Sequence, residues 1–148
     1  MDDVARCPCG SLETFPACCG RYLAADGPAP PTAEALMRSR YTAFVHGDDE
    51  YLVRTWHPDH RPPALDLDPG VEWTGLEVLD RVGGSPFDAE GVVEFRAHSR
   101  RRGRADVQHE RSRFARHAGR WVYVDGVGQP ASARARRAKP SSRSTRGS

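Results

Sequence analysis

Residues 91–125, GVVEFRAHSRRRGRADVQHERSRFARHAGRWVYVD, decide the fold of this chain. Apolar and polar residues alternate along much of this stretch, which is the period of a strand with one buried face. We expect strands over residues 71–82, 91–98, 105–114 and 121–125, with turns at 100–104 and 117–119. Successive strands joined by short turns predict an antiparallel sheet. The last strand is apolar on both faces, so we expect it in the centre of the sheet.

The residues before this sheet have helical spacing. Thr32 can cap a helix that carries Glu34 in its first turn and an apolar face ending near Phe44. A second short helix is expected from Tyr51 to the residue before His57, where Pro58 disfavours helix. Helices followed by a run of strands predict an α+β fold, in which the helices pack on a curved antiparallel sheet.

All the cysteines of the chain fall within a 13-residue window, in the order C-x-C-x8-C-C: Cys7, Cys9, Cys18 and Cys19. Four thiolates gathered so closely predict one structural Zn²⁺, because sulfur ligands then occupy every tetrahedral position. Redox thiols and two disulfides are the alternatives. No C-x-x-C motif is present, and residues 1–7 do not begin a signal peptide. We therefore expect a cytoplasmic protein, in which reducing conditions disfavour disulfides.

Two short strings around these cysteines, residues 7–11 and 18–20, resemble the SEC-C motif, a small zinc-binding module at the end of the protein-export motor SecA. Cys19 stands where SecA commonly has a histidine. The resemblance implies contact with other macromolecules, above all a protein partner. Longer strings resemble the YchJ family, at residues 35–44, 51–58, 73–79, 109–114 and 119–126.

The YchJ resemblance covers residues 7–126 and implies a SEC-C module followed by a cone-shaped domain like that of nuclear transport factor 2. The family implies no assigned activity. We expect four parts: a SEC-C-like zinc knuckle (residues 1–26), a Pro-rich linker (27–31), a nuclear-transport-factor-2-like α+β domain (32–127) and a disordered basic tail (128–148). No apolar run approaches the roughly 20 residues of a membrane span.

The charge of the chain divides between its body and its tail. Residues 127–148 hold six of the 22 Lys and Arg residues and no acid, which leaves 16 basic against 20 acidic residues in 1–126. The tail has almost no large apolar residue, so it cannot offset the entropy cost of ordering. A weak RNA contact and a merely solubilising extension are the two interpretations of this tail.

Three polar residues within the apolar strands could line a pocket of the cone: Glu94, Glu110 and Ser112. Trp56 and His57, where the second helix ends, are expected near the mouth of this pocket. A buried carboxylate has a raised pKa and can act as a general base, with His57 as its proton partner. Ion pairs between these acids and arginines are the structural alternative. Four arginines at a turn could contact a polyanion or simply be solvated: Arg100, Arg101, Arg102 and Arg104.

Together these features favour a zinc-binding protein that acts as a binding or adaptor module rather than as an enzyme. A small lyase- or isomerase-like enzyme using the pocket residues is the first alternative. Association with RNA through the arginine turn and the tail is the second.

Overall fold

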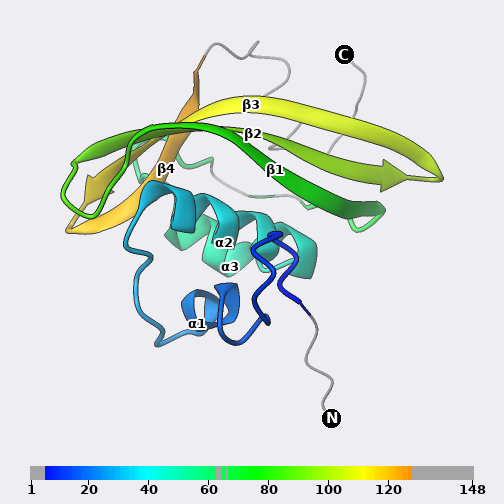
Figure 1. The fold of residues 1–148 in the computed structure, drawn as a ribbon, viewed down its shortest axis with the longest axis horizontal. Coiled ribbons are helices and arrows are strands. Elements are labelled where there is room, and N and C mark those ends of the chain that lie inside the picture. The colour runs from blue at the N-terminus through cyan, green and yellow to red at the C-terminus, as the bar shows by residue number, and fades with distance from the viewer. Residues whose placement is uncertain (1–5, 63–64, 66, 128–148) are drawn as a thin grey trace.

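The computed structural model describes residues 6–62, 65 and 67–127, so the expected tail at 128–148 lies outside the described residues. The elements are α1 (Cys19–Leu23), α2 (Ala33–His46), α3 (Asp49–Arg54), β1 (Val71–Gly83), β2 (Glu90–Arg101), β3 (Arg104–His117) and β4 (Arg120–Val127). Figure 1 shows the sheet arching over α2 and α3, with α1 and the N-terminal loop beneath them. The α+β class and the curved antiparallel sheet are confirmed.

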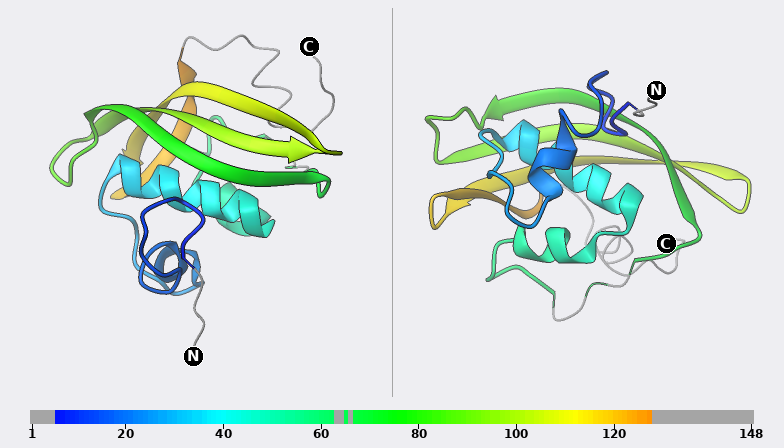
Figure 2. Two further views of the ribbon diagram at one scale, coloured as in Figure 1. Left: turned by 45° about the vertical axis from the view of Figure 1, so that its right-hand side comes forward. Right: turned by 90° about the horizontal axis from the view of Figure 1, so that it is seen from below.

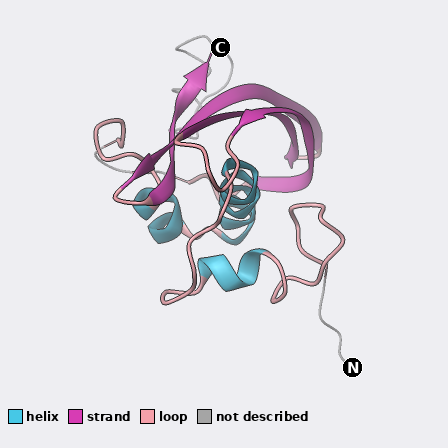
Figure 3. Cartoon of the chain, turned by 60° about the vertical axis from the view of Figure 1, so that its left-hand side comes forward, coloured by secondary structure: helices cyan, strands magenta, loops and turns pink. Residues whose placement is uncertain are grey.

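The four strands form one antiparallel sheet in the order β1-β2-β3-β4. Two tight hairpins set its register. Arg102 and Gly103 have φ of 54° and 79°, and Ala118 and Gly119 have φ of 54° and 81°. Positive φ at both central residues is the type I′ geometry, whose twist matches that of the flanking strands. Figure 3 shows the resulting sheet curling around the helices.

The prediction that β4 is a central strand was wrong, because β4 lies at one end of the strand order. Its outer edge is partly covered by a parallel bridge between Trp56 and Tyr123. The Tyr123 amide donates to the Thr55 carbonyl and the His57 amide donates to the Tyr123 carbonyl, each at 2.8 Å. The segment after α3 therefore shields this edge, which explains an apolar strand at the end of a sheet.

Helix α2 carries the core of the cone. Thr32 Oγ1 accepts from the Ala35 amide (3.0 Å) and begins the helix, and Gly47 in the left-handed region (φ 69°) ends it. The buried cluster on the sheet side consists of Ala33, Leu36, Met37, Val93, Phe114 and Trp121. Burying a side chain such as Leu36 contributes about 1.5–3 kcal/mol. The apolar face that the sequence predicted for this helix therefore packs against buried residues of the sheet.

Pro31, just before α2, contacts strand β4 of the sheet. Trp121 Nε1 donates to the Pro31 carbonyl (3.1 Å), while the Arg116 guanidinium lies 4.5 Å from the centre of the indole ring.

Among the described residues, no helix is both long and apolar enough to cross a membrane.

Candidate metal centre

A short hairpin brings the first two cysteines together. The Cys7 amide donates to the Glu13 carbonyl (2.8 Å), and the Gly10 amide donates to the Cys7 carbonyl (3.2 Å). Gly10 has φ of 85°, a conformation that residues with a side chain seldom adopt. The glycine directly after Cys9 thus lets the chain reverse immediately behind the two sulfur atoms.

The second pair lies where a turn enters α1. The Cys18 amide donates to the Phe15 carbonyl (3.0 Å), and the Gly20 amide donates to the same carbonyl (2.8 Å). A Cβ atom at Gly20 would lie 2.8 Å from that carbonyl oxygen, so this approach requires glycine. Helix α1 starts at Cys19, which allows two adjacent cysteines to point toward one place.

The four Sγ atoms all lie within 4.8 Å of one another. Cys9 and Cys18 Sγ are 3.6 Å apart, and Cys18 and Cys19 Sγ are 4.0 Å apart. A tetrahedral zinc ion with bonds of about 2.3 Å holds its sulfur ligands about 3.8 Å apart. A disulfide needs about 2.05 Å, and all four cysteines are free. The cluster can therefore hold a metal ion with little movement.

Three cysteines of the cluster are buried, and Cys18 is half-buried. Hydrogen bonding with Cys19 and Cys9 lowers the pKa of the Cys7 thiol, whereas hydrogen bonding with Cys7 and Cys9 raises the pKa of the Cys19 thiol. Burial raises the pKa of Cys18. Without a cation, the cluster thus stabilises one thiolate at the expense of its neighbours. A metal ion must displace the remaining protons and would neutralise charge that the site alone cannot hold.

Polar groups outside the quartet orient it. Ser11 Oγ lies 3.1 Å from Cys18 Sγ, and Thr42 Oγ1 of α2 lies 3.6 Å from Cys7 Sγ. Arg38 Nη1 donates to the Cys9 carbonyl (2.6 Å). Such outer contacts fix the direction of the ligands. The sequence did not identify Arg38 or Thr42, because nothing in the spacing of α2 says that it lies beside residues 7–9.

The module packs directly on the cone. Cys7, Cys9 and Cys19 form one buried apolar cluster with Tyr41 of α2 and Ala97 of β2. Figure 2 shows the N-terminal loop and α1 lying along α2. Between the module and α2 lies a cavity of about 270 Å³, whose lining includes Ser11, Cys18, Arg21, Tyr22, Ala35 and Arg38. Cys18, the least buried of the four cysteines, thus lies at this hollow.

Only part of the expected pocket comes together. Glu110 and Ser112 are buried on the inner face of β3, where Ser112 Oγ donates to Glu110 Oε2 (2.9 Å). The Tyr123 hydroxyl donates to the same oxygen (3.1 Å). Arg40 lies beside them with its guanidinium carbon 5.2 Å from the Trp56 ring and 4.8 Å from the Tyr123 ring, and burial lowers its pKa to about 10. Arg40 is one of the arginines that the sequence offered as partners for these acids.

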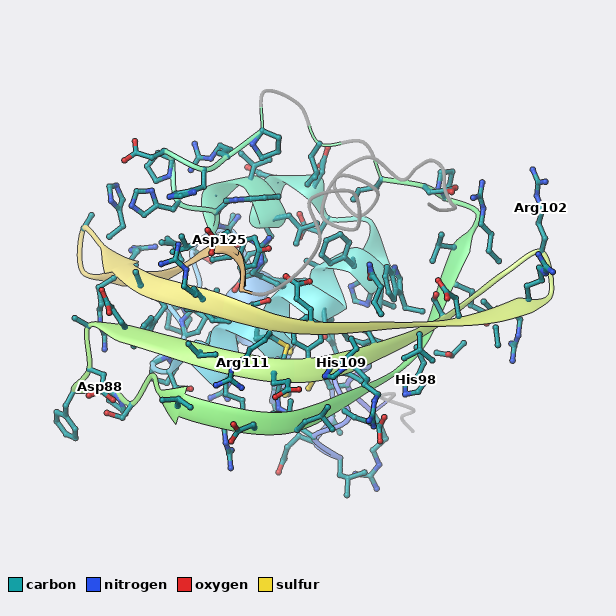
Figure 4. All side chains as sticks on the ribbon, turned by 90° about the horizontal axis from the view of Figure 1, so that it is seen from above. Asp88, His98, Arg102, His109, Arg111 and Asp125 are labelled. Carbon is teal, nitrogen blue, oxygen red and sulfur yellow. The ribbon has the colours of Figure 1, made fainter. Side chains whose placement is uncertain are left out.

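Two of the expected pocket residues lie elsewhere. Glu94 lies on the outer face, where its carboxylate is 2.6 Å from His109 Nε2 and accepts from Arg111 Nη1 (3.0 Å). Figure 4 shows His109 and Arg111 on that face. The alternation of β2 places Glu94 opposite to buried Val93, so the structural alternative of an ion pair holds for this acid. His57 is placed at the end of β3, with its ring centre 5.0 Å from that of His117.

The arginine turn is the tip of the β2–β3 hairpin, where Figure 4 shows Arg102 at its end. Arg101 pairs with Asp68 (3.0 Å), and Arg100 Nη1 lies 3.7 Å from Glu72. Arg102 and Arg104 are exposed. Arg100 and Arg101 are also exposed. Contact with a polyanion through these four arginines stays a prediction.

Known proteins share both parts of this chain. Residues 32–126 match the family described as YchJ, middle NTF2-like domain. A UPF0225 protein of Streptomyces coelicolor is 60% identical over 120 residues, which cover 81% of this chain and 93% of that protein. A UPF0225 protein of Chromobacterium violaceum is 55% identical over 126 residues, which cover 83% of this chain and 93% of that protein.

Two solved structures are similar, and both are described as SEC-C motif containing proteins. The protein of Rhodopseudomonas palustris has a TM-score of 0.72 at 36% identity, covering 84% of this chain and 98% of its own. The protein of Psychrobacter arcticus has a TM-score of 0.65 at 28% identity, covering 80% of each chain. The expected family is confirmed, and this chain belongs to the YchJ family, with a cysteine cluster able to hold a metal ion packed on its NTF2-like domain.

Proposed function

We propose that Cys7, Cys9, Cys18 and Cys19 bind one Zn²⁺ that has a structural role. The convergence of the four sulfur atoms carries this proposal, since all lie within 4.8 Å of one another and two pairs, at 3.6 and 4.0 Å, are close to the roughly 3.8 Å that tetrahedral zinc imposes. Four sulfur ligands leave no position for a substrate. Thiolate ligands also favour zinc over magnesium or calcium, which prefer oxygen.

The ion would give shape to a segment that has little core of its own. Helix α1 has five residues, too few to be stable alone. The zinc would join the hairpin at Cys7–Cys9 to the start of this helix and so hold residues 6–26 as one unit on α2. Residues 27–31 then serve as the linker and residues 32–127 as the cone, in the organisation proposed from the sequence.

The unit would serve as an adaptor surface for a protein partner. Its hairpin presents Leu12, 73% exposed and at a φ of 75°, to solvent. The chain neighbours of Leu12, Ser11 and Glu13, both line the hollow beside Cys18. An exposed apolar side chain next to a hollow is a favourable arrangement for protein recognition, because a partner that covers it removes apolar surface from water.

Metal analysis tests the zinc assignment. Native mass spectrometry of the purified full chain should show one zinc per chain, and Cys9→Ser should lose it together with the order of residues 6–26. Ser11→Ala is the matched control, since Ser11 touches Cys18 without being a ligand. It should keep the zinc. Full zinc stoichiometry in Cys9→Ser, or no metal in the wild type, would contradict the proposal.

The adaptor role is tested separately with a variant that keeps the metal. Leu12→Ser should retain one zinc per chain. It should no longer bind a partner protein that the wild type binds directly, as measured with the purified chain and the purified partner. If Leu12→Ser and Cys9→Ser bind that protein as the wild type does, the module is not the contact surface. The zinc assignment would stand in that case.

A further inference from the structure

Three of the six histidines of the chain gather at one end of the cone. The His57 ring centre lies 5.4 Å from that of His60 and 5.0 Å from that of His117. His57 and His60 follow α3, whereas His117 ends β3, almost sixty residues further along the chain. This cluster is separate from the cysteines and consists of nitrogen donors alone.

The backbone holds each of these histidines in place. The His57 amide donates to the Tyr123 carbonyl of β4 (2.8 Å), and the His60 amide donates to the His57 carbonyl (2.9 Å). His117 pairs with Arg120 across the type I′ turn of the β3–β4 hairpin. The rings of His60 and His117 are exposed, so both can change rotamer without displacing core side chains.

Asp59 stands next to the central imidazole. Its amide donates to His57 Nδ1 (3.1 Å), and its carboxylate oxygen Oδ2 lies 4.0 Å from the same nitrogen. A histidine that binds a metal through Nε2 commonly donates its Nδ1–H to a carboxylate, which fixes the tautomer and the direction of the ring. In this structure Nδ1 instead accepts from the Asp59 amide and therefore carries no proton. Binding through Nε2 would require the imidazole to turn away from that amide and to carry its proton on Nδ1, where the Asp59 carboxylate could accept a hydrogen bond from it.

We propose that His57, His60 and His117 bind a second divalent ion of the class that prefers imidazole, namely Zn²⁺, Ni²⁺ or Cu²⁺. His57 Nε2 is the central ligand, and in the metal-bound form the Asp59 carboxylate accepts a hydrogen bond from Nδ1–H. Among the described residues, only the cysteines have ligand atoms already within 4.8 Å of one another, so the two exposed rings must turn toward His57. Three protein ligands leave a further coordination position open to solvent or to a small molecule.

Calorimetry with Ni²⁺ as the probe tests this site in the zinc-replete full chain at pH 7.5. One Ni²⁺ per chain should bind while the zinc content, measured in the same sample, stays constant. His60→Gln and His117→Gln should each weaken Ni²⁺ binding at least about tenfold, and Asp59→Asn by about 10–100-fold. Glutamine is polar and close to histidine in size, so it should not disturb the fold at these exposed positions.

The controls are His98→Gln and His109→Gln, which remove imidazoles from the outer face of the sheet and should leave Ni²⁺ binding unchanged. In wild-type protein, paramagnetic Ni²⁺ should broaden the imidazole NMR signals of His57, His60 and His117 at lower Ni²⁺ concentrations than those of His98 and His109. Unchanged affinity in His117→Gln overturns the proposal. A loss of the same size in the control variants also overturns it, because it indicates nonspecific binding. Loss of zinc during the titration overturns it too, since the Ni²⁺ would then be entering the cysteine site.

Discussion

Replacing Arg40 by methionine should destabilise the cone strongly, because Arg40 is the buried cation that joins α2 to the end of α3. Arg40 Nη1 donates to the Leu52 carbonyl (2.8 Å) and to Thr55 Oγ1 (2.7 Å). The rings of Trp56 and Tyr123 lie against its guanidinium. Methionine can fill much of the same space but can donate to neither oxygen.

The expected loss follows from these contacts. Each hydrogen bond from a charged donor contributes about 1.5–3 kcal/mol, and a desolvated contact between a cation and a ring contributes about 2 kcal/mol. The dehydration of a buried cation costs several kcal/mol and offsets part of this gain. Arg40→Met should therefore lower the free energy of unfolding by about 3–5 kcal/mol, the range seen when one partner leaves a buried charged network.

Glu110 provides a second test of the role of Arg40, because its buried carboxylate attracts the positive charge of the Arg40 guanidinium. Removing Arg40 leaves that carboxylate without this cation. The double variant Arg40→Met/Glu110→Gln should thus lose at least about 1 kcal/mol less than the two single variants predict by addition.

Urea unfolding followed by tryptophan fluorescence measures all three variants. Arg113→Met is the control, since its partner Asp125 lies on an exposed surface, and it should cost at most about 1 kcal/mol. Additivity of the Arg40 and Glu110 effects within about 0.5 kcal/mol would refute the reasoning. So would an Arg40→Met variant as stable as the control.

Three further predictions concern the linker, the first turn of α2 and the long hairpin. Trp121→Phe keeps a ring in the core but leaves the Pro31 carbonyl without its donor, so it should cost about 1–3 kcal/mol in urea unfolding; an unchanged midpoint would contradict it. Burial tends to raise the pKa of Glu34, but hydrogen bonds from Arg81 and Arg38 prevail and lower it below 4.5. The native state then binds fewer protons, so the stability advantage over Glu34→Gln should be present at pH 7 and lost as the pH falls below about 4; an equal difference at pH 7 and pH 3 would count against this. Arg102→Asn creates Asn-Gly, the preferred type I′ turn, and should raise stability by about 0.5 kcal/mol; a lower urea midpoint would show that Arg102 makes a contact that the turn geometry does not reveal.

Local sequence patterns predicted much of this structure. The alternation in residues 91–125 located β2, β3 and β4, and the helical spacing after Thr32 located α2. The same alternation separated Glu110 and Ser112 from their outward neighbours, because successive side chains of a strand point to opposite faces. It could not give the order of the strands in space, so β4 was wrongly placed in the centre.

The sequence by itself determined the cysteine cluster. Four thiols within 13 residues are typical of a single metal site, and the glycines that follow each pair allow the tight turns. The Cys18–Cys19 pair also required no long-range information, since both residues are placed by one turn and the start of α1.

Only the tertiary structure decided which distant groups meet. Arg38 reaches the Cys9 carbonyl because α2 packs beside the module. His117 meets His57 because β4 pairs with the segment after α3, and Glu94 faces solvent because Val93 takes the core side of β2. These juxtapositions depend on sheet register and helix packing. Both result from the burial of the whole core, to which residues far apart in the sequence contribute together.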